Sequence, residues 1–274
     1  MINFPNAKIN IGLNITEKRA DGFHNIETIF YPISLSDILE VQILAEAGKT
    51  EVANTGITID TPPEKNLTFQ AFRTLQQMYF IPEIKLHLHK IIPFGSGLGG
   101  GSSDGAFTLT MLNKLFSLEL QVDQLKRHAE KLGADCAFFL HNTPQYAFEK
   151  GNEMIATNLS LKGYYLLLVV PNIPISTKFA YQGVSPKRST HSLKQNVEDL
   201  PVESWKNHIK NDFEEHIFSH YPELEMIKEQ LYDAGALYAS LSGSGSSIYG
   251  IFKTKPPVID FPDSCFIWQE KLRC

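Results

Sequence analysis

The chain is poor in cysteine and has no long apolar run, and both shortages exclude whole classes of protein. Its 274 residues include three cysteines, Cys136, Cys265 and Cys274, at scattered spacings. Such cysteines form neither a disulfide framework nor a zinc-binding pattern, so we expect reduced thiols in a cytoplasmic protein. The longest apolar run, Tyr164–Val170, is much shorter than the ~20 residues that cross a bilayer.

Positive charge is also in short supply. Lys and Arg number 25 against 30 Asp and Glu, which gives a formal net charge of −5. The chain lacks the cationic surface on which nucleic-acid affinity depends, so we expect no nucleic-acid partner. Residues 1–6 contain no basic residue, and we expect no secretory signal. With 43% apolar and 20% charged residues, the composition is that of a globular protein with a core.

What the chain has is a mixture of strand and helix patterns. Apolar and polar residues alternate from Ala7 to Ile15, which predicts a strand with Lys8 and Asn10 together on one face. Further strands are predicted at 26–35, 38–44, 52–59, 84–89, 164–170, 237–241 and 248–252. Helices are predicted at 67–79, 103–116, 125–132, 197–209 and 221–234. Because strands often follow one another without an intervening helix, the fold class is α+β.

A change of pattern near Gly151 and Asn152 predicts two domains. The first half is rich in strands, and the second half alternates helices with strands that look antiparallel. At about 100–200 residues per domain, a chain of this length allows two. We place the N-terminal domain at residues 1–155 and the C-terminal domain at residues 156–274.

The densest local signal is the stretch Pro93–Asp104, which contains five glycines between Gly95 and Gly101. It leaves a predicted strand and opens a predicted helix. Glycine lets the backbone approach a ligand closely, and the amides of a helix N-terminus attract phosphate. An acidic protein can therefore bind a polyanion here if amides and a metal ion supply the positive field.

Several interpretations of this loop compete. A Walker A loop is excluded because no lysine follows Gly101. A dinucleotide-binding loop fits the spacing of Gly95, Gly97 and Gly100, with Glu119 as the acidic residue, but the surrounding βαβ unit is missing. A phosphate loop of another kinase type remains, with a plain glycine turn as the structural alternative.

Other segments are ambiguous when taken alone. The small-residue stretch Ser242–Ser247 predicts a connection between two strands. Lys8 alone is a solvated strand residue, and Asp135 alone is a helix N-cap. Cys136 is expected to be a packed thiol.

Together these segments resemble the motifs of the GHMP kinases, which include galactokinase, homoserine kinase, mevalonate kinase and phosphomevalonate kinase. The resembling segments are residues 5–10, the Gly95–Ser103 loop and Leu241–Gly245. Within the family, residues 7–13, 19–24 and 97–103 are most similar to members that phosphorylate a cytidine-diphosphate-linked methylerythritol in non-mevalonate isoprenoid synthesis. The resemblance covers nearly the whole chain.

The resemblance implies a two-domain GHMP kinase fold. The N-terminal domain is expected to be like ribosomal protein S5 domain 2 and to bind ATP, and the C-terminal domain is expected to be ferredoxin-like. It also implies ATP- and Mg²⁺-dependent phosphorylation of the 2-hydroxyl of the acceptor, a small-molecule substrate, no membrane and a monomer or homodimer. Open alternatives are a homoserine- or mevalonate-type kinase and a non-catalytic nucleotide-binding regulator of the same fold.

The resemblance further implies a catalytic pair, Lys8 and Asp135. Asp135 is expected to take the proton of the acceptor hydroxyl, while Lys8 orients Asp135 and the nucleophile and offsets negative charge. Phosphoryl transfer has a loose transition state, so positioning and charge neutralisation matter more than a strong base. Asn10 is expected to hold the acceptor or Asp135.

The implied ATP site combines the glycine-rich loop with a position that contacts adenine. Its members are Pro93, Gly95, Ser96, Gly97, Leu98, Gly99, Gly100, Gly101, Ser102, Ser103, Asn66 and Leu67. Ser102 or Ser103 is expected to reach Mg²⁺, and no acidic metal ligand is evident. A helix N-cap is the alternative for Asn66.

The implied acceptor site includes a cytosine pocket. Its members are Asn10, Phe23, His24, Phe179, Gly243 and Ser244. His24 is expected to meet the cytosine edge, with Phe23 and Phe179 as the two faces of an aromatic sandwich. Core packing is the alternative for Phe179.

Overall fold

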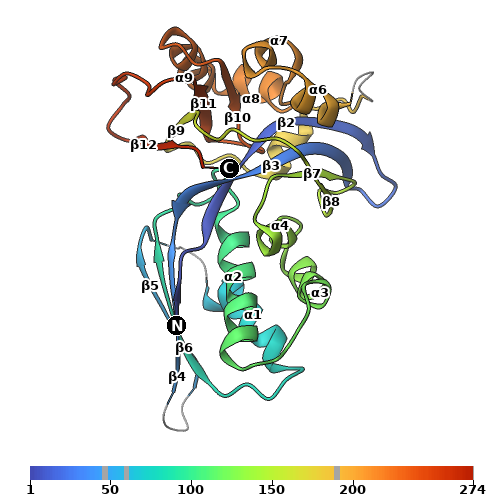
Figure 1. Cartoon of the computed structure of the whole chain (residues 1–274), viewed down its shortest axis with the longest axis vertical. Coiled ribbons are helices and arrows are strands. Elements are labelled where there is room, and N and C mark those ends of the chain that lie inside the picture. The colour runs from blue at the N-terminus through green and yellow to red at the C-terminus, as the bar shows by residue number, and fades with distance from the viewer. Residues whose placement is uncertain (45–48, 59–61, 188–191, 274) are drawn as a thin grey trace. The chain divides into compact units, whose positions relative to one another are not determined.

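A computed structural model describes residues 1–44, 49–58, 62–187 and 192–273. The chain divides into two compact units (Figure 1). Unit 1 comprises Met1–Ala7, Leu35–Phe94 and Gly99–Asn142, and unit 2 comprises Lys8–Ser34, Gly95–Leu98 and Thr143–Cys274. Each unit is built from three separate stretches of the chain. The boundary between residues 155 and 156 stays a prediction.

Unit 1 is a four-stranded sheet with helices along one side (Figure 1). The strands run in the order β1 (Ile2–Asn3), β4 (Ile38–Ile43), β6 (Ile84–Lys90), β5 (Glu51–Gly56). The helices are α1 (Leu67–Gln76), α2 (Gly100–Leu115), α3 (Val122–Leu132) and α4 (Cys136–His141), and η1 (Pro63–Lys65) is a 3₁₀ turn before α1. Alternate residues of β6 are buried, as its sequence predicted, so one face of the strand joins the core.

Unit 2 contains two further four-stranded sheets. The first has the order β2 (Asn6–Lys18), β3 (His24–Ser36), β7 (Gln145–Phe148), β8 (Glu153–Ala156). The second has the order β10 (Tyr238–Leu241), β11 (Ile248–Phe252), β9 (Tyr165–Val170), β12 (Phe266–Lys271), with antiparallel pairing throughout. Central β9 is the longest apolar run of the chain, and its residues Leu166–Val170 are all buried.

Helices occupy the rest of unit 2. They are α5 (Thr177–Gln182), α6 (Leu193–Asp199), α7 (Trp205–His208), α8 (Glu214–His220) and α9 (Pro222–Asp233), and η2 (Val202–Ser204) is a 3₁₀ turn. Helix α9 packs on β10 and β11. The mixture of mainly antiparallel sheets and helices in both units confirms the predicted α+β class.

The helix predicted at 197–209 is wrong as a single element. The chain forms α6, which ends at Asp199, and then η2 and α7. Pro201 explains the break, because the residue before a proline is pushed out of the helical region. Leu200 accordingly has a ψ of 138°.

The starting point predicted for α2 is also wrong. The helix begins at Gly100 and not at Ser103, because Gly99 takes a left-handed φ of 70° and serves as the N-cap. For the strand predicted at 52–59, β5 covers Glu51–Gly56, and the predicted end at Ile59 lies outside the described residues.

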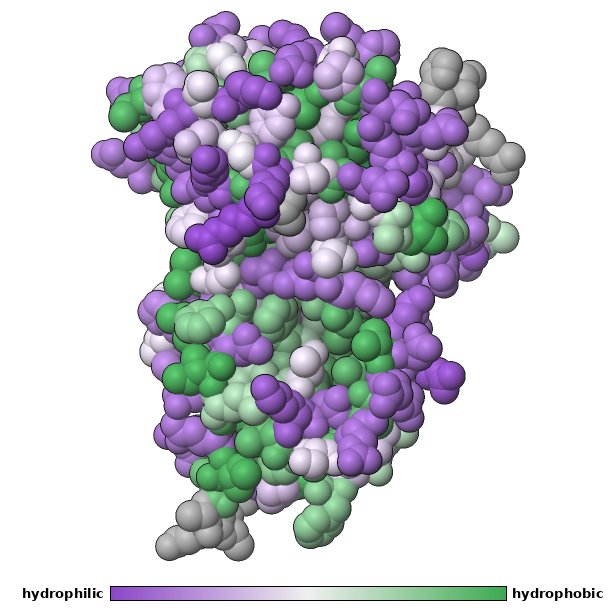
Figure 2. All heavy atoms as spheres, viewed as in Figure 1, coloured by the Kyte–Doolittle hydropathy of each residue, from purple (hydrophilic) through white to green (hydrophobic). Residues whose placement is uncertain are grey.

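Polar and apolar surfaces are distributed unevenly. In the view of Figure 2, hydrophobic spheres gather over unit 1, whereas hydrophilic ones dominate the face of unit 2. Phe4, Phe80 and Phe94 are among the large apolar side chains that unit 1 exposes. Among the residues that the structure describes, no helix has the length and apolarity needed to cross a membrane.

A buried ion network lies inside unit 1. Lys90 Nζ contacts Asp37 Oδ2 at 2.5 Å and Asp104 Oδ2 at 2.7 Å, and the three side chains are at most 3% exposed. The second oxygen of Asp37 accepts hydrogen bonds from the amides of Ile91 and Ile92. Burial by itself lowers the pKa of Lys90, but the carboxylates of Asp104 and Asp37 raise it by more than burial lowers it. The net pKa is above the ordinary value, so the ammonium stays charged. The network therefore joins β6, α2 and the start of β4.

Removing the cation of this network should destabilise the protein strongly. Lys90→Met leaves two buried carboxylates without their partner, and we expect a loss of about 3–5 kcal/mol in the free energy of unfolding. Lys85→Met is the matched control, because Lys85 lies on the same strand but is 45% exposed in an ion pair with Glu51. That control should change stability by less than about 1 kcal/mol. Denaturant unfolding of both variants checks this, and equal losses would contradict it.

Candidate active site

Lys8 and Asn10 lie together on β2, as the alternation of the sequence predicted. Both are almost fully buried, and Lys8 Nζ donates to Asn10 Oδ1 at 2.5 Å. The amide nitrogen of Asn10 donates to Thr28 Oγ1 at 2.9 Å, and that hydroxyl donates to the Gly12 carbonyl at 2.6 Å. This chain of hydrogen bonds fixes the Asn10 amide with its oxygen toward the ammonium. Lys8 is therefore a held cation and not a solvated strand residue.

The carbonyl of Gly97 joins Lys8 to the first part of the glycine-rich loop. It accepts from Lys8 Nζ at 2.9 Å and from Ser242 Oγ at 3.0 Å. Gly97 has a φ of 79°, and a Cβ at this position would stand 2.0 Å from the Ser242 carbonyl oxygen. Only glycine permits both the left-handed backbone and the close approach of the two chains.

The Ser242–Ser247 loop therefore has a second role besides connecting β10 to β11. The backbone amide of Ser247 donates to the Ser96 carbonyl at 3.1 Å. The backbone amide of Asn10 donates to Ser242 Oγ at 3.2 Å. A Cβ on Gly243 would stand 3.3 Å from Asn10 Oδ1, and Ser244 Oγ lies 3.4 Å from Thr177 Oγ1. The structure brings these loop residues to the Lys8 strand, which no local pattern in the sequence could show.

The second part of the glycine-rich loop opens α2 in unit 1. Gly99, at the N-cap, has no side chain to bond the first helical amides, which leaves those amides available to an anion. Gly100 lies directly over the buried network, since a Cβ there would stand 2.9 Å from Lys90 Nζ. The Lys90 ammonium therefore lies close beneath the helix start, with its two carboxylates.

Two serines follow in the first turn of α2. The Ser103 side chain is fully buried, and its Oγ has no hydrogen-bond partner among the described residues. Ser102 is half-buried. Of the two predicted metal-facing hydroxyls, only that of Ser102 is accessible to a ligand. No group of three or more His, Cys, Asp or Glu side chains in the described ranges could hold a metal ion.

Asp135 occupies the N-cap position of α4 but does not cap it. Its side chain makes no hydrogen bond to the first amides of that helix, and its backbone is helical, with φ −77° and ψ −13°. The N-cap interpretation of this carboxylate is therefore wrong. Burial raises the pKa of the neighbouring Cys136 to about 12, so this residue is the packed, unreactive thiol that was expected.

Asn66 is the N-cap of α1, which confirms the second of the two roles predicted for it. Its Oδ1 accepts from the Thr68 amide at 2.9 Å and from the Thr68 hydroxyl at 2.8 Å. Leu67 packs near the start of α2, where a Cβ on Gly101 would be 3.8 Å from its Cδ1. The predicted contact of both residues with adenine stays a prediction, on a backbone that the cap holds in place.

The aromatic residues are arranged differently from the expected sandwich. The His24 ring stacks on Tyr181, with 4.7 Å between centroids and 17° between planes. Phe179 instead packs on His216 of α8, at 4.8 Å, while Phe23 is 61% exposed. Tyr181 is not among the residues that the sequence predicted for the site. It lies two residues after Phe179 on α5, a spacing that places the two rings on different sides of a helix. The role of Phe179 in a cytosine pocket stays a prediction.

The His24 side chain is suited to reading a polar edge. Burial, with a smaller contribution from Lys18, lowers the pKa of His24 below its ordinary value. The ring is therefore neutral at physiological pH and presents one N–H donor and one nitrogen acceptor.

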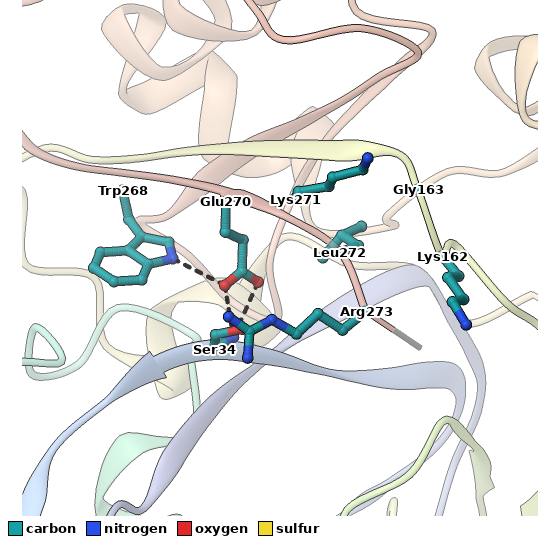
Figure 3. A pocket seen from close by; sticks show the side chains of 8 residues that line it. All are labelled: Ser34, Lys162, Gly163, Trp268, Glu270, Lys271, Leu272 and Arg273. Carbon is teal, nitrogen blue, oxygen red and sulfur yellow. Dashed lines mark hydrogen bonds between the residues drawn. The ribbon is translucent and has the colours of Figure 1, made fainter.

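A cavity of about 540 Å³ elsewhere in unit 2 contains none of the predicted site residues. Figure 3 shows Glu270 of β12 at its centre, with Arg273 pointing toward the carboxylate. Glu270 accepts from the Ser34 amide at 2.9 Å and from Trp268 Nε1 at 3.3 Å (Figure 3). These bonds join β12 to β3, which accounts for the carboxylate without a ligand.

Comparison with protein families identifies two matching domains. The GHMP kinases N terminal domain matches residues 66–143, and the GHMP kinases C terminal domain matches residues 195–262. The first range holds α1–α4 and the glycine-rich loop, and the second holds α8, α9 and the Ser242–Ser247 loop.

Relatives of high identity extend over the whole chain. A 4-diphosphocytidyl-2-C-methyl-D-erythritol kinase from Parabacteroides distasonis is 49% identical, covering 99% of this chain and 100% of that relative. One from Bacteroides fragilis is 48% identical over 100% of both chains.

Solved structures give the same answer for the fold. The crystal structure of 4-(cytidine 5'-diphospho)-2C-methyl-D-erythritol kinase has a TM-score of 0.73 at 28% identity, over 92% of this chain and 90% of that one. A homoserine kinase from Cytophaga hutchinsonii has a TM-score of 0.65 at 17% identity, over 98% and 95%. The second likeness concerns the fold alone, and together with the family matches it confirms the expected two-domain architecture.

Proposed function

This chain belongs to the GHMP kinase family, and we propose that it transfers the γ-phosphoryl group of ATP to the 2-hydroxyl of 4-diphosphocytidyl-2-C-methyl-D-erythritol. Relatives that match it over nearly their full length at 48–49% identity carry the name of that kinase. The observation that carries the proposal is the hydrogen bond from Lys8 Nζ to the Gly97 carbonyl. It supports the predicted roles by joining the lysine to the phosphate loop inside one unit.

The reaction needs little covalent participation by the protein. The acceptor oxygen forms a bond to the γ-phosphorus, the bond from that phosphorus to the bridging oxygen breaks, and ADP leaves. Because the transition state is loose, its charge is spread over the phosphoryl oxygens, and fixed donors stabilise it. We assign this work to the held Lys8 ammonium, the loop amides and the first amides of α2.

Asp135 is the proposed acceptor of the hydroxyl proton. Its carboxylate is half-buried and makes no capping bond to α4. A general base has only to take the proton as the phosphoryl group is captured, which a carboxylate can do.

The hydroxyl at the start of α2 is compatible with a magnesium ion that arrives with ATP. Mg²⁺ keeps several waters and is held in large part by the phosphate oxygens of its substrate, so few protein ligands are needed. Ser102 is the residue that we propose to face the ion, which would neutralise phosphate charge. We also propose that the enzyme works in the cytoplasm, where ATP is supplied.

A panel of acceptors tests the proposed reaction. Purified protein with ATP and Mg²⁺ should release ADP with 4-diphosphocytidyl-2-C-methyl-D-erythritol and not with mevalonate or homoserine. Comparable turnover of either of the last two would overturn the substrate assignment. Nucleotide binding without turnover of any acceptor would instead indicate a regulator of the same fold.

Replacement of Asp135 tests the general base. Asp135→Asn is nearly isosteric and should change the free energy of unfolding by less than about 1 kcal/mol, because no capping bond is lost. Its kcat should fall about 10²- to 10⁴-fold, because an amide cannot take the proton. Asp123→Asn, on the exposed start of α3, is the control and should keep wild-type kcat. An Asp135→Asn variant with more than about a tenth of wild-type kcat would rule out the base.

Two paired variants decide which ring holds the cytosine. Stacking on a base contributes about 1–3 kcal/mol, so Tyr181→Ala should raise the KM of the acceptor about 5- to 150-fold. The KM of ATP should hardly change. Phe179→Ala removes a ring that packs on α8 and should chiefly lower the melting temperature. The reverse result, with the acceptor KM raised only in Phe179→Ala, would restore the pocket expected from the sequence.

A further inference from the structure

The segment Asn211–Glu214 leads into α8, whose first residue is Glu214. Three of its side chains accept from or donate to backbone groups of other elements. It runs beside β2, where the Leu13 amide donates to the Lys210 carbonyl at 2.9 Å and the Asp212 amide donates to the Leu13 carbonyl at 2.8 Å. Asp212 Oδ2 also accepts from the Ile15 amide at 2.7 Å. The segment is thereby fixed to the strand that carries Lys8 and Asn10.

Asn211 holds the other end of the connection. Its side chain is 2% exposed, and its amide nitrogen donates to the carbonyls of Leu241 and Gly243, each at 2.9 Å. These two carbonyls flank Ser242 on either side. The Asn211 oxygen accepts from the Phe213 amide at 3.0 Å, which orients the side chain with its nitrogen toward the loop.

Glu214 holds the strand that enters the same loop. Its Oε1 accepts from the Leu241 amide at 2.9 Å and from Ser240 Oγ at 3.1 Å. Its Oε2 pairs with Lys228 Nζ at 2.7 Å, and the carboxylate is 12% exposed. The residues immediately before Ser242 are therefore bonded through both amide and hydroxyl.

What these contacts hold is the Ser242 hydroxyl. The Ser242 hydroxyl donates to the Gly97 carbonyl, which also accepts from the Lys8 ammonium. The same hydroxyl accepts from the backbone amide of Asn10. We propose that Asn211 and Glu214 are positioning residues for phosphoryl transfer, which place Ser242 so that Gly97 and Lys8 keep their geometry. The inference rests on the proposed function, because it takes Lys8 as the cation of that reaction.

Unit 2 offers a matched carboxylate that makes the same kinds of bond elsewhere. Glu198 accepts from Thr157 Oγ1 at 2.8 Å and from the Asn158 amide at 2.9 Å, and it pairs with Lys194 at 2.6 Å. It is 16% exposed, close to the value for Glu214. None of its partners belongs to the loops or to β2, so its removal measures the structural cost alone.

The test compares steady-state kinetics of Glu214→Ala, Glu214→Gln, Asn211→Ala and Glu198→Ala below their melting temperatures. Small misplacements of reacting groups cost up to about 100-fold, so Glu214→Ala and Asn211→Ala should lower kcat about 10- to 100-fold with both KM values within about threefold of wild type. Glu214→Gln keeps an acceptor for the Leu241 amide and should retain most of kcat. Glu198→Ala should lose melting temperature and keep kcat.

Two results would overturn the inference. One is a Glu214→Ala variant with no lower kcat than Glu198→Ala, and the other is a Glu214→Gln variant as impaired as Glu214→Ala. If Asn211→Ala does not fold, the Glu214 pair and its control still decide the question. A Lys8→Met variant with wild-type kcat, or wild-type protein inactive on the cytidine-linked acceptor, would instead refute the proposed function.

Discussion

The carbonyl oxygen of Gly97 is the point on which the arrangement of the candidate site residues in unit 2 depends. It accepts two hydrogen bonds, from the Lys8 ammonium and from the Ser242 hydroxyl. Its own residue must be glycine because the Ser242 carbonyl lies where a Cβ would stand. A strand and two loops from distant parts of the sequence thus meet at one acceptor, and the lysine is fixed by geometry that none of the three contains alone.

Each unit contains a buried lysine, and the two lysines have different partners. Lys90 of unit 1 pairs with carboxylates, whereas Lys8 of unit 2 donates to an amide oxygen and a carbonyl. The Lys90 ammonium beneath the start of α2 is matched by two buried carboxylates, so it serves the core of unit 1 and is not a free cation for a polyanion. Under the proposed function, the positive field for ATP comes instead from backbone amides and from Lys8. This explains how a chain of net charge −5 can bind a polyanion.

The aromatic residues illustrate how a one-dimensional pattern leaves open which of two rings lies against His24. Phe179 and Tyr181 both lie on α5, and both rings have the chemistry for base stacking. The structure distinguishes them by their neighbours, since His24 stacks on Tyr181 while Phe179 joins the histidines of α8. Composition cannot decide between them because the partner of each ring comes from another part of the chain.

The sequence by itself determined the α+β class, the strand that pairs Lys8 with Asn10, and the glycine-rich loop that opens a helix. These properties are local, because they depend on alternation, helix starts and the conformational freedom of glycine. It also permitted the family to be identified from three short motifs. The break of the helix before Pro201 is equally local, because it follows from the proline alone.

Only the tertiary structure decided that the Ser242–Ser247 loop meets the Lys8 strand, that Asp135 leaves α4 uncapped, and that Tyr181 faces His24. It also decided that Asn211 and Glu214, unremarkable polar residues in the sequence, hold that loop. Each is a contact between segments far apart in the chain. Such contacts follow from the packing of whole elements, which the spacing of residues along a single segment does not encode.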